Sequence, residues 1–216
     1  MTIQESADDL ALPNTRLAAE TARFVATHEP PAIANHSIRS YLFARILARR
    51  RGMRPGQDFD DELLFLACAL HDIGLTAIAD KEQRFEVDGA DAAAEFLAGK
   101  GLSSSDVDAV WQAIALHTSG GIAERRGPLC QLTRGGVALD ISADGGIVDD
   151  DAARAIHSRY PRLSMARELV DAIVAQVRAK PAKAPAYSLP AELARERHDL
   201  GVTGVERAAR SGRWGE

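Results

Sequence analysis

The chain has 216 residues, of which 46% are hydrophobic and 26% charged, and its formal net charge is −5. This length suits one domain whose core is large enough to fold without disulfides or structural metals. The net negative charge argues against nucleic acid as a partner. No apolar run reaches the roughly 18 residues that a membrane helix requires, which argues against a membrane protein.

Two further features of the sequence indicate the compartment. Residues 1–13 lack the basic and apolar regions of a signal peptide. Cys68 and Cys130 lie in or near apolar runs and show no paired spacing. We therefore expect buried thiols in a cytoplasmic protein.

The first half of the chain is predicted to be helical, because apolar residues recur at steps of three and four. The first helix starts at Asn14 or Thr15, continues to His28 and ends before Pro30-Pro31. The second spans 33–51 and carries an apolar stripe that includes Ile38 and Leu42. Asp60 should cap a third helix over 61–71, because its carboxylate can accept the free amide hydrogens of the first turn. Residues 75–85 form a short helix or a loop.

The second half continues the pattern, so we expect an all-α fold. Further helices are predicted at 87–100, 106–117, 133–142, 149–158 and 165–179. The glycine pairs 120–121, 135–136 and 145–146 are interpreted as turns. Prolines at 181, 185 and 190 mark a linker. We therefore divide the chain into a helical domain over 1–180 and a segment over 181–216, in which a linker and a peripheral C-terminal tail pack on or flank the domain.

The dipeptide His71-Asp72 closes the apolar run 65–70 and is the strongest functional signal. Adjacent side chains on a helix point about 100° apart, so the helix end must aim both of them into one pocket. An imidazole beside a carboxylate is typical of half a metal site, and His36 and Asp140 are the candidates for the missing ligands. Two imidazoles and two carboxylates suit Zn²⁺, Fe²⁺, Mn²⁺ or Ni²⁺ and leave positions open for water and substrate.

The choice of Asp140 has an alternative in Asp144, which lies four residues further along the same predicted helix. Leu139 and Ile141 indicate that Asp140 is buried, and a buried carboxylate needs a partner. We favour Asp140 for this reason.

The order His36, His71-Asp72, Asp140 resembles the H…HD…D pattern of the HD-domain superfamily of metal-dependent hydrolases over about residues 30–145. This resemblance implies an HD-domain helical bundle. The strings NHSIRSY at 35–41, LHDIG at 70–74 and RFEVDGA at 84–90 are similar to the cyanamide hydratase group within it. That similarity implies a hydro-lyase that converts cyanamide to urea with a metal-bound hydroxide, most often on zinc.

Superfamily members with two metals have two further histidines between the HD pair and the last aspartate, whereas this chain has only His117 there. We therefore expect a single catalytic metal. His117 is the first candidate for a proton shuttle or for orienting the substrate, and Glu86 is the second. His117 could instead cap its helix, where a cationic imidazole is favourable, and Glu86 could be a surface acid.

Two other functions compete with nitrile hydration. An HD-type phosphohydrolase acting on a nucleotide or small phosphate ester needs cationic groups around the phosphate, and only Arg39 and Arg84 lie near the site in sequence. A non-catalytic sensor or scaffold would retain buried charges that are costly to keep. The expected partner is a small-molecule substrate, and a homo-oligomer is left open.

Overall fold

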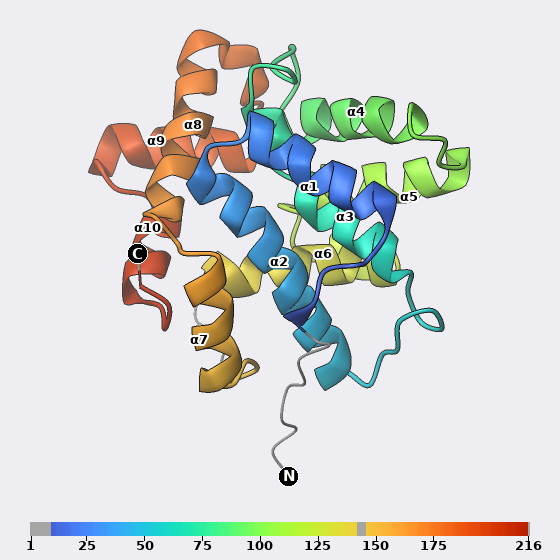
Figure 1. The fold of residues 1–216 in the computed structure, drawn as a ribbon. Coiled ribbons are helices and arrows are strands. Elements are labelled where there is room, and N and C mark those ends of the chain that lie inside the picture. The colour runs from blue at the N-terminus through green and yellow to red at the C-terminus, as the bar shows by residue number, and fades with distance from the viewer. Residues whose placement is uncertain (1–9, 142–145, 216) are drawn as a thin grey trace.

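A computed structural model describes residues 10–141 and 146–215, which form a bundle of helices (Figure 1). Apart from a single bridge between Pro55 and Phe59, the regular structure in these residues is helical, so the prediction of an all-α fold is confirmed. None of the described helices combines the length and apolar composition needed to cross a bilayer. The α-helices are α1 (Arg16–His28), α2 (Pro31–Arg50), α3 (Asp61–Leu70), α4 (Phe85–Ala98), α5 (Ser104–Leu116), α6 (Pro128–Ile141), α7 (Asp150–Arg159), α8 (Met165–Ala179), α9 (Leu189–Leu200) and α10 (Gly204–Ser211).

Local sequence sets most helix starts. The Thr15 side chain accepts from the backbone N–H of Ala18, and the Asp60 carboxylate accepts from that of Leu63, as the capping prediction requires. Helix α2 begins at Pro31, two residues earlier than predicted, because proline suits the first helical position.

Helix α6 differs most from the prediction. It begins at Pro128, five residues before the expected start, and it includes Gly135 and Gly136. The interpretation of this glycine pair as a turn is therefore wrong. Gly121 and Gly146 do have positive φ angles, of 81° and 86°, while Gly145 lies outside the described residues.

Helix α2 crosses the middle of the bundle and packs against α1, α3, α6, α7 and α8 (Figure 1). Fourteen of its residues are buried, including His36 and Arg39. One core cluster joins α1 to α7, and a second joins α8, α9 and α10. Helix α2 therefore holds His36 and Arg39 in the interior of the fold.

The contact between α2 and α6 is close because Gly136 has no side chain. A Cβ at this position would lie 2.0 Å from the Ser40 carbonyl oxygen and 2.9 Å from the Ala44 Cβ. Asp140 follows Gly136 by one turn of α6, and His36 precedes Ser40 by one turn of α2. The glycine thus sets the spacing at which Asp140 meets His36.

We expect Gly136→Ala to lower the free energy of unfolding by about 1–3 kcal/mol, because two backbones would have to move apart. Urea denaturation measures this effect. Gly135→Ala is the matched control, since its Cβ would meet only the flexible end of Leu47, at 2.3 Å from Cδ2. Alanine also favours a helix by up to about 1 kcal/mol over glycine, so the control should stay within about 1 kcal/mol of wild type. Equal effects of the two variants would contradict this account.

The C-terminal segment packs on α8 through α9 and α10. Leu193 and Ala209 are buried in the second core cluster. The ammonium group of Lys183, which is also buried, donates to the carboxylates of Asp80 and Asp88 at 2.8 and 2.7 Å. This segment is therefore joined to the rest of the chain by hydrophobic packing and by a buried ion pair. The division into two parts at residue 180 stays a prediction.

Candidate metal centre

Three of the predicted ligands meet in the interior of the protein. His36 lies on α2, His71 is the C-cap residue of α3, and Asp72 follows it at the start of a 3-10 turn. All three are buried, and each offers one ligand atom within 4.8 Å of the others. The end of α3 therefore does aim His71 and Asp72 toward one point, as the sequence predicts.

In both His36 and His71, the ring nitrogen Nδ1 lies within hydrogen-bond distance of an acceptor. Nδ1 of His71 lies 2.7 Å from the carbonyl oxygen of Cys68, and Nδ1 of His36 lies 2.6 Å from Oδ2 of Asp140. A carbonyl oxygen or an ionised carboxylate can only accept, so Nδ1 of both rings carries the hydrogen. In the neutral form of each ring, Nε2 therefore keeps its lone pair.

These lone pairs face one another and a carboxylate. Nε2 of His36 lies 3.3 Å from Nε2 of His71, and Oδ2 of Asp72 lies 3.1 and 3.7 Å from Nε2 of His71 and His36. Oδ2 of Asp72 is buried and has no hydrogen-bond partner. Three acceptor atoms that converge in a buried space repel one another unless a proton or a metal ion lies between them. This donor set of two imidazoles and a carboxylate fits a divalent transition-metal ion.

Burial and neighbouring charges shift the pKa values of the three groups in different directions. Burial lowers the pKa of His36. Burial also opposes protonation of His71, but the adjacent Asp72 outweighs it and raises the pKa of this imidazole. Burial likewise favours the neutral acid at Asp72, yet the three neighbouring histidines hold its pKa below the usual range.

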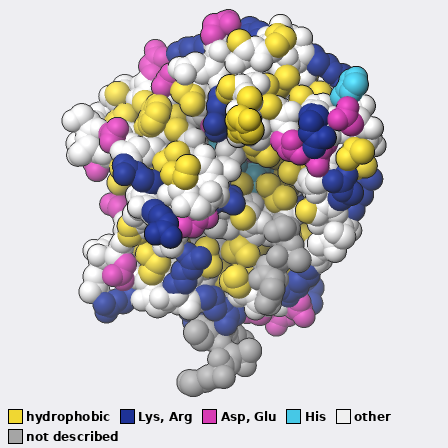
Figure 2. Space-filling model, turned by 180° about the vertical axis from the view of Figure 1, so that it is seen from behind, with side chains coloured by type: hydrophobic (Ala, Val, Ile, Leu, Met, Phe, Trp, Pro, Cys, Tyr) yellow, Lys and Arg dark blue, Asp and Glu magenta, His cyan; other side chains and the backbone are white. Residues whose placement is uncertain are grey.

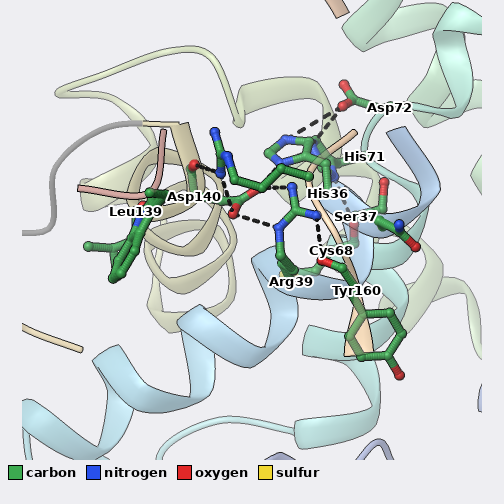
Figure 3. A network of polar contacts seen from close by, with 12 residues as sticks. His36, Ser37, Arg39, Cys68, His71, Asp72, Leu139, Asp140 and Tyr160 are labelled. Atoms are coloured by element: carbon green, nitrogen blue, oxygen red, sulfur yellow. Dashed lines mark hydrogen bonds and ion pairs between the residues drawn. The ribbon is translucent and has the colours of Figure 1, made fainter. Parts of the chain in front are cut away.

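Asp140 lies on the other side of His36, outside the group of three (Figure 3). The guanidinium of Arg39 donates a hydrogen bond to each oxygen of the Asp140 carboxylate, with Nε 2.8 Å from Oδ1 and Nη2 2.7 Å from Oδ2. Arg162 adds a contact from Nη1 to Oδ1 at 3.2 Å. Burial alone would raise the pKa of Asp140, but Arg39 and His36 hold it below its usual range.

The arrangement makes Asp140 the group that orients His36, because a carboxylate on Nδ1 leaves Nε2 facing the other ligands. Its predicted role as a direct ligand stays a prediction. Asp144, the alternative, lies outside the described residues.

His117 faces the same space from the end of α5. Its Nδ1 lies 2.6 Å from the carbonyl oxygen of Ile114, and its Nε2 lies 3.9 Å from Oδ1 of Asp72. Burial, with a contribution from His71, lowers the pKa of His117 to about 4. His117 thus does cap its helix, but as a buried neutral imidazole whose second nitrogen points into the site.

Glu86 is buried in the first turn of α4, which rules out its reading as a surface acid. Its carboxylate accepts from Arg84, with Nη2 2.8 Å from Oε1, and from the Thr118 hydroxyl at 2.7 Å. Thr118 lines the pocket above the metal group, whereas Glu86 does not. Glu86 therefore holds a pocket residue in place, and its predicted catalytic role stays a prediction.

The metal group forms one end of a pocket of about 250 Å³. Figure 2 shows a hollow with hydrophobic side chains around it and histidine at its floor. His36, His71, Asp72 and His117 lie at the polar end, and Thr118 with side chains from α4, α6, α8, α9 and α10 forms the remainder. A small molecule in this pocket would reach the site of the ion directly.

Comparison with known proteins agrees with this geometry. Residues 33–176 match the HD domain, a range that holds His36, His71, Asp72, His117 and Asp140. The chain belongs to the HD-domain family. Two proteins of Saccharomyces cerevisiae, cyanamide hydratase DDI2 and cyanamide hydratase DDI3, are each 29% identical to it over 161 residues. The aligned region covers 70% of this chain and 68% of each relative.

The HD domain and this distant relationship indicate an enzyme. They confirm the resemblance to the HD-domain superfamily and to its cyanamide hydratases that the sequence motifs indicated. They also fit the buried His36, His71 and Asp72 group, which could hold a metal ion.

Two parts of this HD-domain site have no signal in the sequence: Arg162 lies too far along the chain to be connected with Asp140, and no pattern marks Arg134 as a pocket residue. For Arg39 the sequence allows two interpretations, a pairing with a ligand carboxylate or a side chain that extends to solvent. The structure shows the pairing, with Asp140. Arg39 follows His36 by three residues on α2, so both side chains lie on one face and can reach one partner.

Proposed function

We propose that this protein hydrates a small nitrile, with cyanamide as the first candidate and urea as the product. One divalent ion, with zinc as the first candidate, would be held by His36, His71 and Asp72. The observation that carries the proposal is the convergence of Nε2 of His36, Nε2 of His71 and the unpaired Oδ2 of Asp72 at the floor of a pocket. The names of the two yeast relatives support the choice of substrate.

The chemistry needs a nucleophilic water and a proton on nitrogen. A divalent ion, when bound, supplies Lewis acidity that polarises a nitrile and lowers the pKa of water. Water then adds across the C≡N bond, so that a C–O bond forms and the nitrogen gains a proton. The resulting isourea tautomerises to urea, and no oxidant or second substrate is required.

We propose that His117 moves that proton. Its Nε2 carries a lone pair because Nδ1 donates to the Ile114 carbonyl. Nε2 can therefore take a proton from the attacking water and deliver it to the nitrile nitrogen. Asp140 and Arg39 have a different part, since they hold His36 in the ring orientation that binding the ion requires.

Phosphate ester hydrolysis has less support. A phosphate pocket needs several cationic groups, and Arg134 is the one arginine or lysine in the described lining. Its Nε lies 3.2 Å from Oε1 of Glu124, which offsets the charge. We therefore propose a small uncharged substrate and no nucleic-acid partner.

The test is to load the protein with zinc and assay two kinds of substrate. We expect urea from cyanamide and no phosphate from a panel of nucleoside mono- and triphosphates. Elemental analysis of protein purified without added metal should find about one ion per chain. Phosphate release without urea would overturn the proposal.

We expect His117→Ala to keep the bound ion and to lower kcat for cyanamide by about 100-fold, the usual scale for a lost acid–base group. Elemental analysis and the urea assay measure the two effects. His198→Ala is the matched control, because the side chain of His198 is 88% exposed on α9. Turnover of His117→Ala at the wild-type level would contradict the shuttle role.

A further inference from the structure

The pocket is much larger than cyanamide. A molecule of liquid water takes up about 30 Å³, and cyanamide has three non-hydrogen atoms, so it needs the space of only a few waters. The pocket volume is about 250 Å³. A dry apolar cavity of about 150 Å³ is already sufficient for a benzene ring. Cyanamide bound at the metal group would therefore leave most of the pocket unfilled.

The unfilled part has an apolar wall. We use the term apolar wall for Val137 and Ile141 of α6, Leu169 and Ile173 of α8, Leu193 of α9 and Val205 of α10. A buried water needs two to four polar partners, and hydrocarbon side chains supply none. Water is thus a poor occupant of this space, whereas a hydrocarbon group would gain by leaving solvent.

The apolar wall is part of the folded core. Ile173 and Leu193 are 1% and 2% exposed and belong to the second core cluster, which also contacts Val205. The wall is braced where α10 begins, because Thr203 and Glu206 form a capping box. The Arg197 guanidinium of α9 pairs with Glu206 at 2.9 Å. These contacts hold α9 and α10 together, and with them the part of the wall that Leu193 and Val205 form.

The two charged residues in the described pocket lining, Asp72 and Arg134, already have partners. Asp72 belongs to the metal group, and Arg134 lies with Glu124 and also donates from Nη1 to the His117 carbonyl oxygen at 3.3 Å. A charged substituent against the apolar wall would lose its hydration without gaining a partner. The geometry favours an uncharged one.

We propose that the substrate is an organic cyanamide or nitrile whose substituent is an uncharged hydrocarbon group of about ring size. This inference rests on the proposed function and names its substrate class. The nitrile carbon lies at the metal group and the substituent lies against the apolar wall. For a substituted cyanamide, R–NH–C≡N and water give R–NH–CO–NH₂. The oxygen of water bonds to carbon, and its two hydrogens end on the former nitrile nitrogen.

The test compares cyanamide with benzylcyanamide on the zinc-loaded protein. We expect kcat/KM for benzylcyanamide to exceed that for cyanamide by at least about tenfold, since each methylene bound in an apolar pocket contributes about that much. Val205→Phe fills the pocket from α10 and should lower this ratio at least about tenfold. Val177→Phe makes the same change in the second core cluster but outside the pocket lining, so the ratio should stay at the wild-type value.

A binding measurement separates this inference from the proposed function. In calorimetry, benzylurea should bind wild type and Val177→Phe at least about tenfold more tightly than urea does, and Val205→Phe should lose this difference. Hydration of cyanamide with no preference for benzylcyanamide, and no tighter binding of benzylurea, would overturn the inference and leave the proposed function standing.

Two other outcomes are decided in the same experiment. If neither nitrile is hydrated, the proposed function fails, and the inference about a nitrile substrate fails with it. The preference for benzylcyanamide is measured on the wild-type protein. This measurement can therefore contradict the inference even if the Val205→Phe protein does not fold.

Discussion

Asp72→Asn is expected to abolish metal binding and to lower cyanamide hydration by at least about 1,000-fold, because the Lewis acid supplies several kcal/mol to the transition state. The substitution keeps the shape of the side chain but removes its negative charge. Its amide N–H can also donate to the Nε2 lone pair of His71, which lies 3.1 Å from Oδ2 of Asp72. The variant should therefore fold while it fails to hold the ion. Elemental analysis and the urea assay measure both results.

Asp60→Asn is the matched control, at the opposite end of α3. Asp60 caps α3 by accepting from Leu63, and asparagine caps a helix about as well as aspartate. This variant should keep its ion and its activity. One ion per chain in Asp72→Asn would show that Asp72 is not a ligand and would remove the basis of the proposed mechanism.

Arg39→Met is expected to lower the free energy of unfolding by about 3–5 kcal/mol, because it leaves the buried Asp140 carboxylate without its main partner. Both residues are fully buried, and two hydrogen bonds join them. His36 would also be less well oriented, so affinity for the ion should fall by about 10–100-fold. Urea denaturation and metal titration measure the two effects.

The matched control for Arg39→Met is Arg45→Met on the same helix. Nη1 of Arg45 lies 3.0 Å from Oδ2 of Asp61, and both side chains are partly exposed. An ion pair of this kind contributes about 1 kcal/mol or less. Equal costs for the two variants would contradict the importance of the pairing between Arg39 and Asp140.

The stability deficit of Arg39→Met should also depend on pH. The pKa of Asp140 is lowered in the wild-type fold, so the carboxylate stabilises the protein above its unfolded pKa of about 4, and this contribution is lost as the pH falls through the folded value. Without Arg39, burial favours the protonated acid, and acid removes the uncompensated charge. The deficit should therefore be largest near neutral pH and shrink as the pH falls toward about 4, which denaturation at several pH values measures. A deficit that grows on acidification would contradict this sign.

Residues close together in the chain account for what the sequence predicted well. The capping role of Asp60 and the end of the first helix before Pro30 depend on the next few residues only. The turn predicted at Gly136 was wrong because this glycine has another purpose. It leaves room for a carbonyl oxygen of α2, which any side chain at this position would meet. A local rule cannot distinguish a glycine that allows a turn from one that allows two helices to approach.

The sequence by itself determined the all-α class, because the helical spacing of apolar residues is a local property of the chain. It also determined the candidate set of His36, His71, Asp72 and Asp140, because residue type and order suffice to identify possible ligands. Tertiary structure alone decided that Arg39 pairs with Asp140 and that Asp140 contacts Nδ1 of His36, the ring nitrogen opposite the group of three. It also decided that α8, α9 and α10 supply the apolar wall. The physical reason is that hydrogen-bond direction and burial depend on groups brought together from distant parts of the chain, such as residues 39 and 140, whose separation no local pattern encodes.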